Sequence, residues 1–256
     1  MYQFLHTLLS DKKGGAIFTL FSGWHFFYIL LTAVAVTLTL LLVRSKGADL
    51  KKRVPRLFIN TAFGLYIADI FLMPPAYGEI DVEKLPFHAC TAMCVACFLS
   101  YLIPRLERYR SSLVLLGLIS NLVYLVYPAG VMWHAVHPTS YRVVQTLLFH
   151  SVMTAYGILF LVLERESLRE QSPGKYLPRD LAVTVSMTLW ALLGNYTYNH
   201  ADAFYNWFFV VRDPFYVIPE SISPFVMPPL VVALFFSVQA LLRLILSLTR
   251  RAHKNQ

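Results

Sequence analysis

Charged residues are scarce in this chain. Lys, Arg, Asp and Glu make up 14% of its 256 residues, whereas a soluble domain of ordinary composition carries about 25%. Acidic residues are rarer than basic ones, with 14 Asp and Glu against 22 Lys and Arg. At the same time, 57% of the residues are hydrophobic. This composition excludes an ordinary soluble domain and predicts a surface that faces hydrocarbon.

Cysteine is also rare, and Cys90, Cys94 and Cys97 all lie in one apolar stretch. An odd number in one segment excludes a disulfide framework. Their spacing places them on one face of a helix, where small residues serve close helix packing. A redox pair at Cys94 and Cys97 lacks a second pair for exchange, and a His88/Cys90/Cys94 metal site needs ligands from other helices. We expect neither a metal nor a cofactor.

Long apolar runs are abundant. A membrane-spanning helix needs about 20 mostly apolar residues. Seven segments qualify, at residues 23–44, 56–74, 86–103, 111–127, 141–163, 178–200 and 225–248. Pro55, Pro86 and Pro178 stand at helix starts, where proline is tolerated, while Pro228 and Pro229 predict irregular first turns in the seventh. The predicted fold class is all-α, a polytopic membrane protein with seven transmembrane helices.

Basic residues are sorted between the two ends of these helices. Seventeen of the 22 fall on one side, namely Arg44, Lys46, Lys51, Lys52, Arg53, Arg56, Arg105, Arg108, Arg110, Arg165, Arg169, Lys175, Arg179, Arg243, Arg250, Arg251 and Lys254. The other side holds Lys12, Lys13, Lys84, Arg142 and Arg212. Because basic loops stay in the cytoplasm, we predict the N-terminus outside, the C-terminus in the cytoplasm, and a multi-pass protein of the cell membrane.

The positive net charge does not indicate nucleic acid, because the basic residues stand in short loops between apolar runs. Membrane lipid is the expected partner, and the oligomeric state stays open. Residues 1–21 have their basic pair after the apolar stretch, the wrong order for a signal peptide. We interpret them as an interfacial segment. No long linker divides the chain, so residues 1–256 are predicted to form a single domain.

Polar side chains inside the helices crowd toward the outer side. Such residues usually face a bundle interior or a wet cavity, so we predict an outward-facing polar chamber. Its reactive members are His88, Cys90, His150 and Asp69. Each also has a structural interpretation. His150 is then a hydrogen-bonded core histidine, and His88 is an interfacial histidine. Cys90 then serves helix packing, and Asp69 pairs with a neighbouring Tyr or His.

Several motifs resemble those of YwaF-like bacterial integral membrane proteins. Leu85-Pro86-Phe87-His88-Ala89-Cys90 resembles the LPxHxC signature of the third helix, and Gln145 through His150 resembles the FQxxxxH stretch of the fifth. Asn206-Trp207-Phe208-Phe209 through Arg212-Asp213-Pro214 resembles the NYLFL…KP segment before the seventh. Gly23-Trp24-His25 is similar to the part of that family that carries a histidine near the start of the first helix. The motif order holds from about residue 20 to 245.

This family is related to the eukaryotic transmembrane protein 164 group, described as acyltransferases that move a fatty acyl chain onto ether phosphatidylethanolamine with a Cys and a His. The resemblance implies a lipid acyl-transfer role here. His88 and His150 carry over. The nucleophilic Cys of the eukaryotic group precedes the His, and Phe87 stands at that position. The nearest thiol is Cys90.

Acyl transfer needs a nucleophile, a base and donors to the developing oxyanion. We predict His150 as base, with His88 and Cys90 completing the catalytic set. A second route has no covalent step, and the histidines then activate an acceptor hydroxyl. On a regular helix His88 and Cys90 point about 200° apart, which counts against a direct pair. The predicted substrate-binding residues are Asp69, Asn121, Asn195, Tyr198, Asn206 and His25.

Two other classes remain open at this point. A seven-helix chamber also suits a transporter of small polar solutes, although repeated broken helices, common in such folds, are not evident. A membrane scaffold would use the same polar residues only to bridge helices. A closed, fully hydrogen-bonded cluster favours the scaffold, a cavity open to the outer leaflet favours lipid chemistry, and a continuous polar path favours transport.

Overall fold

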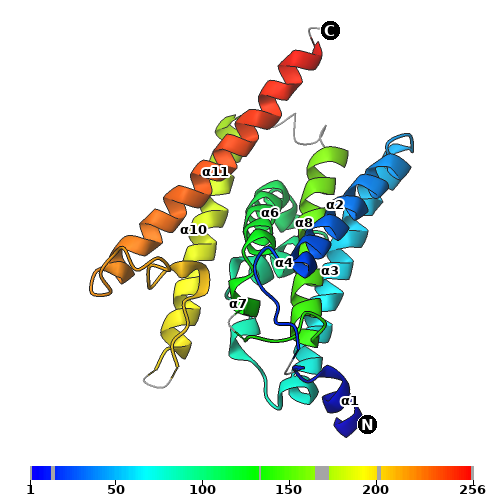
Figure 1. The fold of residues 1–256 in the computed structure, drawn as a ribbon. Coiled ribbons are helices and arrows are strands. Elements are labelled where there is room, and N and C mark those ends of the chain that lie inside the picture. The colour runs from blue at the N-terminus through cyan, green and yellow to red at the C-terminus, as the bar shows by residue number, and fades with distance from the viewer. Residues whose placement is uncertain (1, 13–14, 133, 165–172, 201–202, 255–256) are drawn as a thin grey trace. The chain divides into compact units, whose positions relative to one another are not determined.

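A computed structural model describes residues 2–12, 15–132, 134–164, 173–200 and 203–254. Over these ranges the fold is all-helical and contains no β-strand, as the sequence predicts (Figure 1). In chain order the elements are α1 (Tyr2–Leu9), α2 (Gly23–Val43), α3 (Ala48–Tyr77), η1 (Val82–Lys84), α4 (Ala89–Leu99), α5 (Pro104–Glu107), α6 (Arg110–Val126), α7 (Ala129–Met132), α8 (Tyr141–Leu163), α10 (Pro173–Tyr198), η2 (Trp207–Phe209) and α11 (Ser223–Lys254). Lys13, Arg165 and Arg169 of the charge count lie outside the described residues.

Five helical stretches of the described chain are long and apolar enough to cross a membrane: Gly23–Val43, Ala48–Tyr77, Arg110–Met132, Tyr141–Leu163 and Ser223–Ser247. The expected seven spans are not confirmed. The predicted span 86–103 contains only α4, whose 11 residues measure about 17 Å against roughly 30 Å of hydrocarbon. α10 has 26 residues, but its last turns, from Gly194 to Tyr198, are polar. The number of spans and their direction stay predictions.

Three helices run through prolines that we expected at their limits or as breaks. α3 begins at Ala48 and contains Pro55, and α10 begins at Pro173 and contains Pro178. α11 is one continuous helix across Pro228 and Pro229. Lys, Arg and Ala favour helix whether or not lipid surrounds them. The helices therefore extend beyond the apolar stretches from which the limits were inferred.

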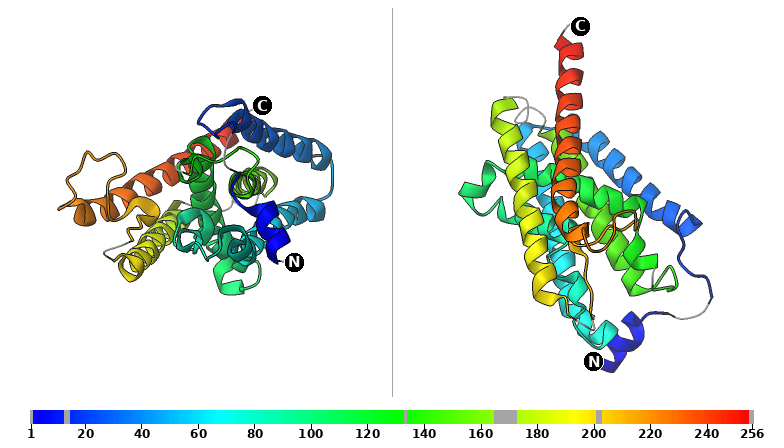
Figure 2. Two further views of the ribbon diagram at one scale, coloured as in Figure 1. Left: turned by 60° about the horizontal axis from the view of Figure 1, so that its bottom comes forward. Right: turned by 90° about the vertical axis from the view of Figure 1, so that its left-hand side faces the viewer.

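One compact unit comprises Met1–Lys84 and Gly117–Glu164. In this unit 1, α3 packs along α8, α2 packs on α8, and α1 packs on α3 (Figures 1 and 2). One core cluster of this unit consists of Phe18, Tyr28, Leu125, Val131, Val136, Val143 and Leu147. A Cβ atom at Gly157 would lie 2.8 Å from the Cβ of Leu118. Glycine is therefore what allows α8 to approach α6 so closely.

The second compact unit comprises Leu85–Leu116 and Arg165–Gln256. In this unit 2, α10 and α11 run antiparallel and side by side, and η2 packs against both (Figure 2). Each unit combines two separate parts of the chain. The single domain predicted from the sequence is untested and stays a prediction.

Candidate functional site

His150, on α8, is 4% exposed, and its proton position is set by α6. Asn121 donates through Nδ2 to the carbonyl of Gly117 at 2.7 Å. Its Oδ1 therefore faces His150 Nδ1, at 2.8 Å. Because an amide oxygen only accepts hydrogen bonds, Nδ1 carries the proton. Neutral His150 consequently has its lone pair on Nε2, the tautomer that a base acting at Nε2 requires.

The surroundings of His150 combine an aromatic ring with two hydroxyls. The Tyr124 ring stacks on the imidazole with centroids 3.8 Å apart and planes 13° from parallel. Ser151 and Thr154 follow on α8, and Thr154 lies one turn from His150 on the same face. Both hydroxyls are buried, and neither has a hydrogen-bond partner among the described residues. A buried hydroxyl without a partner is unfavourable, so this face of α8 suits a polar ligand atom.

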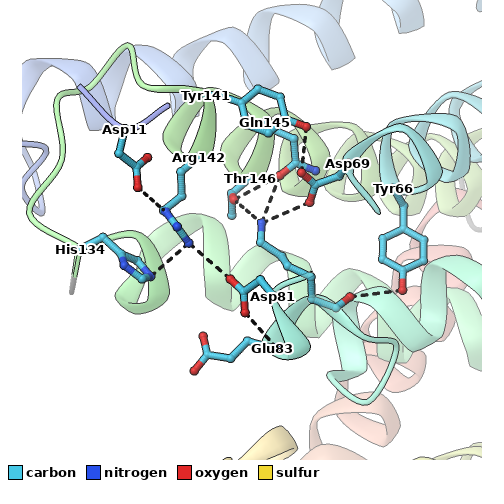
Figure 3. Close-up of polar contacts among 11 residues, drawn as sticks. Asp11, Tyr66, Asp69, Asp81, Glu83, His134, Tyr141, Arg142, Gln145 and Thr146 are labelled. Atoms are coloured by element: carbon cyan, nitrogen blue, oxygen red, sulfur yellow. Dashed lines mark hydrogen bonds and ion pairs between the residues drawn. The ribbon is translucent and has the colours of Figure 1, made fainter. Parts of the chain in front are cut away.

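Asp69 belongs to a buried network in unit 1 (Figure 3). Its Oδ2 lies 3.3 Å from Lys84 Nζ, and its Oδ1 accepts from the Tyr141 hydroxyl at 2.9 Å. The Lys84 ammonium also donates to Thr146 Oγ1 at 3.1 Å and Gln145 Oε1 at 3.3 Å. The Asp69 side chain is 1% exposed. These contacts join α3, η1 and α8, and the predicted substrate contact of Asp69 stays a prediction.

Arg142, in the first turn of α8, organises a second charged cluster beside this network (Figure 3). Its Nε donates to Asp11 Oδ2 at 3.0 Å, and its Nη1 lies 3.4 Å from Asp81 Oδ2. The same Nη1 donates to His134 Nε2 at 3.3 Å, and the guanidinium stacks 4.1 Å above the Tyr77 ring. Arg142 thereby fastens the N-terminal segment and the loop after α3 to α8. From the sequence, Arg142 is only one of the five basic residues predicted on the outer side.

Both ring nitrogens of His25 contact the main chain of unit 1. Nδ1 accepts from the Phe21 N–H at 3.0 Å, so Nε2 carries the proton and donates to the Leu125 carbonyl at 2.8 Å. His25 is fully buried. Its contacts are those of a structural histidine, and its predicted contact with substrate stays a prediction.

His88 and Cys90 belong to unit 2. His88 is the N-cap residue of α4 and has extended backbone angles, φ −73° and ψ 144°. The expected 200° separation assumed a regular helix from residue 86, so that objection to a joint role falls away. Cys90 is partly buried, whereas Cys94 and Cys97 are fully buried. Among the residues that the structure describes, no three His, Cys, Asp or Glu side chains gather as ligands of a metal ion would.

Aromatic rings pack around Phe87, the residue before His88. Its ring centroid lies 5.0 Å from that of Trp207, 5.1 Å from that of Trp190 and 5.7 Å from that of Tyr198. Gly194 on α10 contacts the Phe87 ring so closely that a Cβ atom would collide with it. Phe87 is therefore a packing residue in unit 2. Tyr198 contributes its ring to this cluster, and its predicted substrate contact is untested.

Asn195 and Asn206 hold the segment around η2. Asn195 Oδ1 accepts from the Trp207 N–H at 3.0 Å, and its Nδ2 donates to the Trp207 carbonyl at 3.1 Å. Asn206 makes the same reciprocal pair with Arg212, at 3.1 and 2.7 Å. Between them Phe208 has a left-handed φ of 58°, a strained conformation for a non-glycine residue. Both amides donate to main chain, and their predicted substrate contacts stay predictions.

An apolar groove lies between α10 and α11, with a volume of about 380 Å³. It extends from Leu181 to Leu192 on α10 and from Pro228 to Phe236 on α11. Thr188 is its polar lining residue, and that hydroxyl already donates to the Thr184 carbonyl at 3.0 Å. The groove therefore presents an almost wholly apolar surface.

The profile of the TMEM164 family matches residues 20–249. The chain belongs to the TMEM164 family. This membership confirms the relationship indicated by the sequence motifs and is compatible with the YwaF-like resemblance, which it does not test. No curated protein and no solved structure matches the chain. Together with the five span-length helices, membership identifies a multi-pass membrane protein.

This TMEM164-family protein also contains a buried ion pair that the sequence analysis missed. Arg243 of α11 donates through Nε and Nη2 to the two carboxylate oxygens of Asp180 on α10, at 2.8 Å each. The two side chains are 5% and 0% exposed. We counted Arg243 among the cytoplasmic loop charges. The sequence did contain a signal for this ion pair, because Arg243 lies inside the apolar segment 225–248, where an unpaired charge is unfavourable.

Proposed function

We propose that this TMEM164-family protein transfers an acyl group between membrane lipids, with His150 as the general base. The observation that carries the proposal is the proton position on His150, which follows from the Gly117–Asn121–His150 hydrogen bonds. An amide that orients a histidine and selects its tautomer is the arrangement that acyl-transfer enzymes use to prepare a base. His25 is held differently, because its Nε2 proton is donated to the Leu125 carbonyl and its Nδ1 accepts from the Phe21 N–H.

The proposed step is a transesterification. Nε2 of His150 removes the proton from a lipid hydroxyl as that oxygen attacks the ester carbonyl of a second lipid. The tetrahedral intermediate then expels its original alcohol oxygen, which takes the proton back from His150. One ester and one alcohol enter, and one ester and one alcohol leave. Positioned general bases contribute roughly 10²- to 10⁴-fold to such rates.

A covalent route through Cys90, the thiol nearest to His88 in the sequence, is a second variant of this proposal. The Cys90 thiol would lose its proton and attack the donor ester, and the donor alcohol would leave with that proton as the thioester forms. The acceptor hydroxyl would then attack the thioester, which forms the new ester, breaks the C–S bond and returns the proton to the Cys90 sulfur. A thiolate needs a nearby positive charge or donor to form. His88 precedes Cys90 by two residues, and the extended backbone of His88 supports a role for it there.

Lipid is the proposed substrate because the protein is a multi-pass membrane protein, and the groove of unit 2 shows by itself a surface that suits an acyl chain. The groove is apolar and measures about 380 Å³, within the range of roughly 300–1,000 Å³ typical of small-molecule sites. Its α10 side, Leu181 to Leu192, has a length of about 17 Å, close to one leaflet of hydrocarbon. One acyl chain suits these dimensions.

The test compares His150 with His25, a matched buried histidine. Purified wild-type protein, His150→Ala and His25→Gln are reconstituted into vesicles that contain a phospholipid with an isotope-labelled acyl chain and an unlabelled lysophospholipid acceptor. Mass spectrometry follows the label. We expect transfer by wild type and a loss of at least roughly 100-fold in His150→Ala. His25→Gln measures the loss that comes from replacing a buried histidine elsewhere in unit 1, and the loss in His150→Ala should exceed it. In cells, a deletion strain that carries His150→Ala should show the lipid profile of the deletion.

The Cys90→Ser variant distinguishes the thioester route from direct attack in the same assay. Loss of transfer with normal folding supports the thioester route, and a trapped acyl-protein adduct in wild type would locate it. Retained transfer supports direct attack by the acceptor hydroxyl. Equal transfer by wild type and His150→Ala, in protein shown to be folded by its thermal transition, would overturn the assignment of His150.

A further inference from the structure

The loop before α11 exposes three large apolar side chains in succession. Phe215 is 81% exposed, Tyr216 is 73% exposed and Val217 is 80% exposed. Burying such side chains in an apolar environment is favourable. An aqueous setting for this loop is therefore unfavourable.

A carboxylate holds this apolar tip in one conformation. Asp213 is 4% exposed, and it accepts hydrogen bonds from the main-chain N–H groups of Phe215 at 2.9 Å, Val217 at 2.7 Å and Ile218 at 2.9 Å. Tyr216 takes a left-handed φ of 57° within this turn. The hydrogen bonds from Phe215 and Ile218 lower the pKa of Asp213, so the Asp213 carboxylate is charged at neutral pH. The three side chains are presented by a preorganised turn.

Charged side chains stand at the base of the same loop. Arg212 pairs with Glu220 at 2.9 Å, and its guanidinium lies 4.4 Å above the Phe204 ring. The side chains of the pair are 33% and 63% exposed. The loop is therefore polar at its base and apolar at its tip, the order found where chains lie at a membrane–water interface.

The apolar surface continues from the loop into a membrane-spanning helix. α11 begins at Ser223, six residues after Val217. Phe225 is 79% exposed and Leu230 is 48% exposed, and both belong to the stretch that is apolar enough to cross the bilayer. In a multi-pass membrane protein such residues on α11 face lipid. Lipid is thus the environment that is continuous with the loop tip.

We propose that Phe215, Tyr216 and Val217 form a preorganised anchor that inserts into the bilayer interface of the leaflet where α11 begins. The partner is the lipid itself, at the boundary of headgroups and acyl chains. Asp213 sets the depth and orientation of the anchor through its three hydrogen bonds. The inference depends on membrane insertion of α11 and is independent of acyl transfer.

The experiment uses the full chain reconstituted in phosphatidylcholine vesicles whose acyl chains carry an alkyne. A benzophenone amino acid replaces Phe215 or Val217, and Glu220 in the same loop serves as the matched control position. After irradiation, alkyne labelling of the protein reports lipid adducts. We expect strong labelling from positions 215 and 217 and at least several-fold weaker labelling from position 220. Adding Asp213→Asn should lower the yield at position 215 several-fold.

Other outcomes overturn the proposal. Crosslinks from position 215 to a second polypeptide, or to another segment of the same chain, would assign the tip to a protein contact. Equal lipid labelling at positions 215 and 220 would show lipid contact without an anchor. If Asp213→Asn lowers the yield of folded protein, Asp213→Glu, which keeps the charge, provides the second variant, and its labelling must exceed that of Asp213→Asn.

Discussion

At the scale of single residues, one amide separates the two buried histidines of unit 1. Both His25 and His150 are at most 4% exposed, and a sequence shows them as similar residues in apolar helices. The main chain uses both nitrogens of His25. Asn121 accepts from Nδ1 of His150 and thereby determines which nitrogen carries the lone pair. The partner, rather than the histidine, determines the chemistry that each ring can perform.

Asn121 provides a prediction about positioning. Asn121→Leu removes the acceptor of His150 Nδ1–H, so the ring loses its fixed tautomer, and we expect acyl transfer to fall roughly 10-fold or more. Asn121→Asp keeps an acceptor at the same place and should recover most of the rate. The vesicle transfer assay and a thermal unfolding curve measure both variants. A rate for Asn121→Leu that equals wild type would contradict the positioning role.

His134 provides a prediction about pH. Partial burial and the positive charge of Arg142 lower the pKa of His134 below its usual 6.5, while the carboxylates of Asp11 and Asp81 oppose this and Lys84 adds to it. A lowered histidine pKa means that the unfolded chain binds the proton more readily. The stabilising contribution is therefore complete above pH 6.5 and is lost as the pH falls through the folded-state pKa.

We accordingly expect the thermal midpoint of wild type to fall more steeply between pH 7 and pH 5 than that of His134→Gln, whose side chain still accepts from Arg142 but does not titrate. Protonation would place two cations in contact, because Arg142 Nη1 already donates to His134 Nε2. Thermal unfolding in detergent at a series of pH values measures the difference. Parallel curves for the two proteins would refute the assignment.

At the scale of helices, unit 2 depends on a charged contact between α10 and α11. The bidentate Arg243–Asp180 pair is buried, and Arg243 also reaches Ser111 and Ser112 of α6 at 3.2 and 3.4 Å. Such a pair is weak evidence for stability by itself, but removing one partner leaves a buried charge without compensation. The pair therefore specifies which faces of the two helices meet.

A double-mutant cycle tests this contact. Asp180→Leu alone should destabilise the protein by about 3–5 kcal/mol, and Arg243→Met alone by a similar amount, because each leaves its partner unpaired. The combined variant should lose much less than the sum, since no charge remains buried. Denaturant unfolding in detergent provides the free energies. Additive losses in the combined variant would show that the two side chains act independently.

At the scale of the whole molecule, the number of membrane crossings is the open quantity. Five helical stretches of the described chain have spanning length and composition, and the sequence predicts seven spans. Both numbers are odd, so both place the termini on opposite sides. They differ at residues 104–109: if α4 crosses, this loop is cytoplasmic, and if it does not, the loop lies outside. Arg105 and Arg108 favour the cytoplasm.

We therefore expect Glu107→Cys to be protected from a membrane-impermeant maleimide applied to intact cells. Glu107 is 66% exposed, so its protection would come from the membrane and not from burial. Glu79→Cys serves as the outside reference and Ser45→Cys as the cytoplasmic reference. Labelling is scored by the mass of the purified protein. Reaction of Glu107→Cys from outside would remove the crossing by α4 and the seven-span topology with it.

The candidate site was predictable from sequence only in part. His150 and Asn121 stood out because polar residues are rare inside apolar helices, and the motif around His88 indicated the family. The sequence did not show that Lys84 neutralises Asp69, that Asn195 and Asn206 hold main chain, or that His88 precedes its helix. The sequence also did not show that Asp69 accepts from Tyr141, 72 positions away along the chain, because such a contact is set by the packing of α3 on α8 and not by a local pattern.

The sequence by itself determined membrane insertion, the all-helical class and family membership. The length of the apolar runs and the scarcity of charge depend on the solvent around a helix, and they do not depend on which helices are its neighbours. Tertiary structure alone decided the proton position on His150, the burial of Arg243 against Asp180, and the apolar turn clamped by Asp213. The physical reason is that protonation and pairing depend on which atoms lie within about 3 Å, and that distance is set by packing between helices.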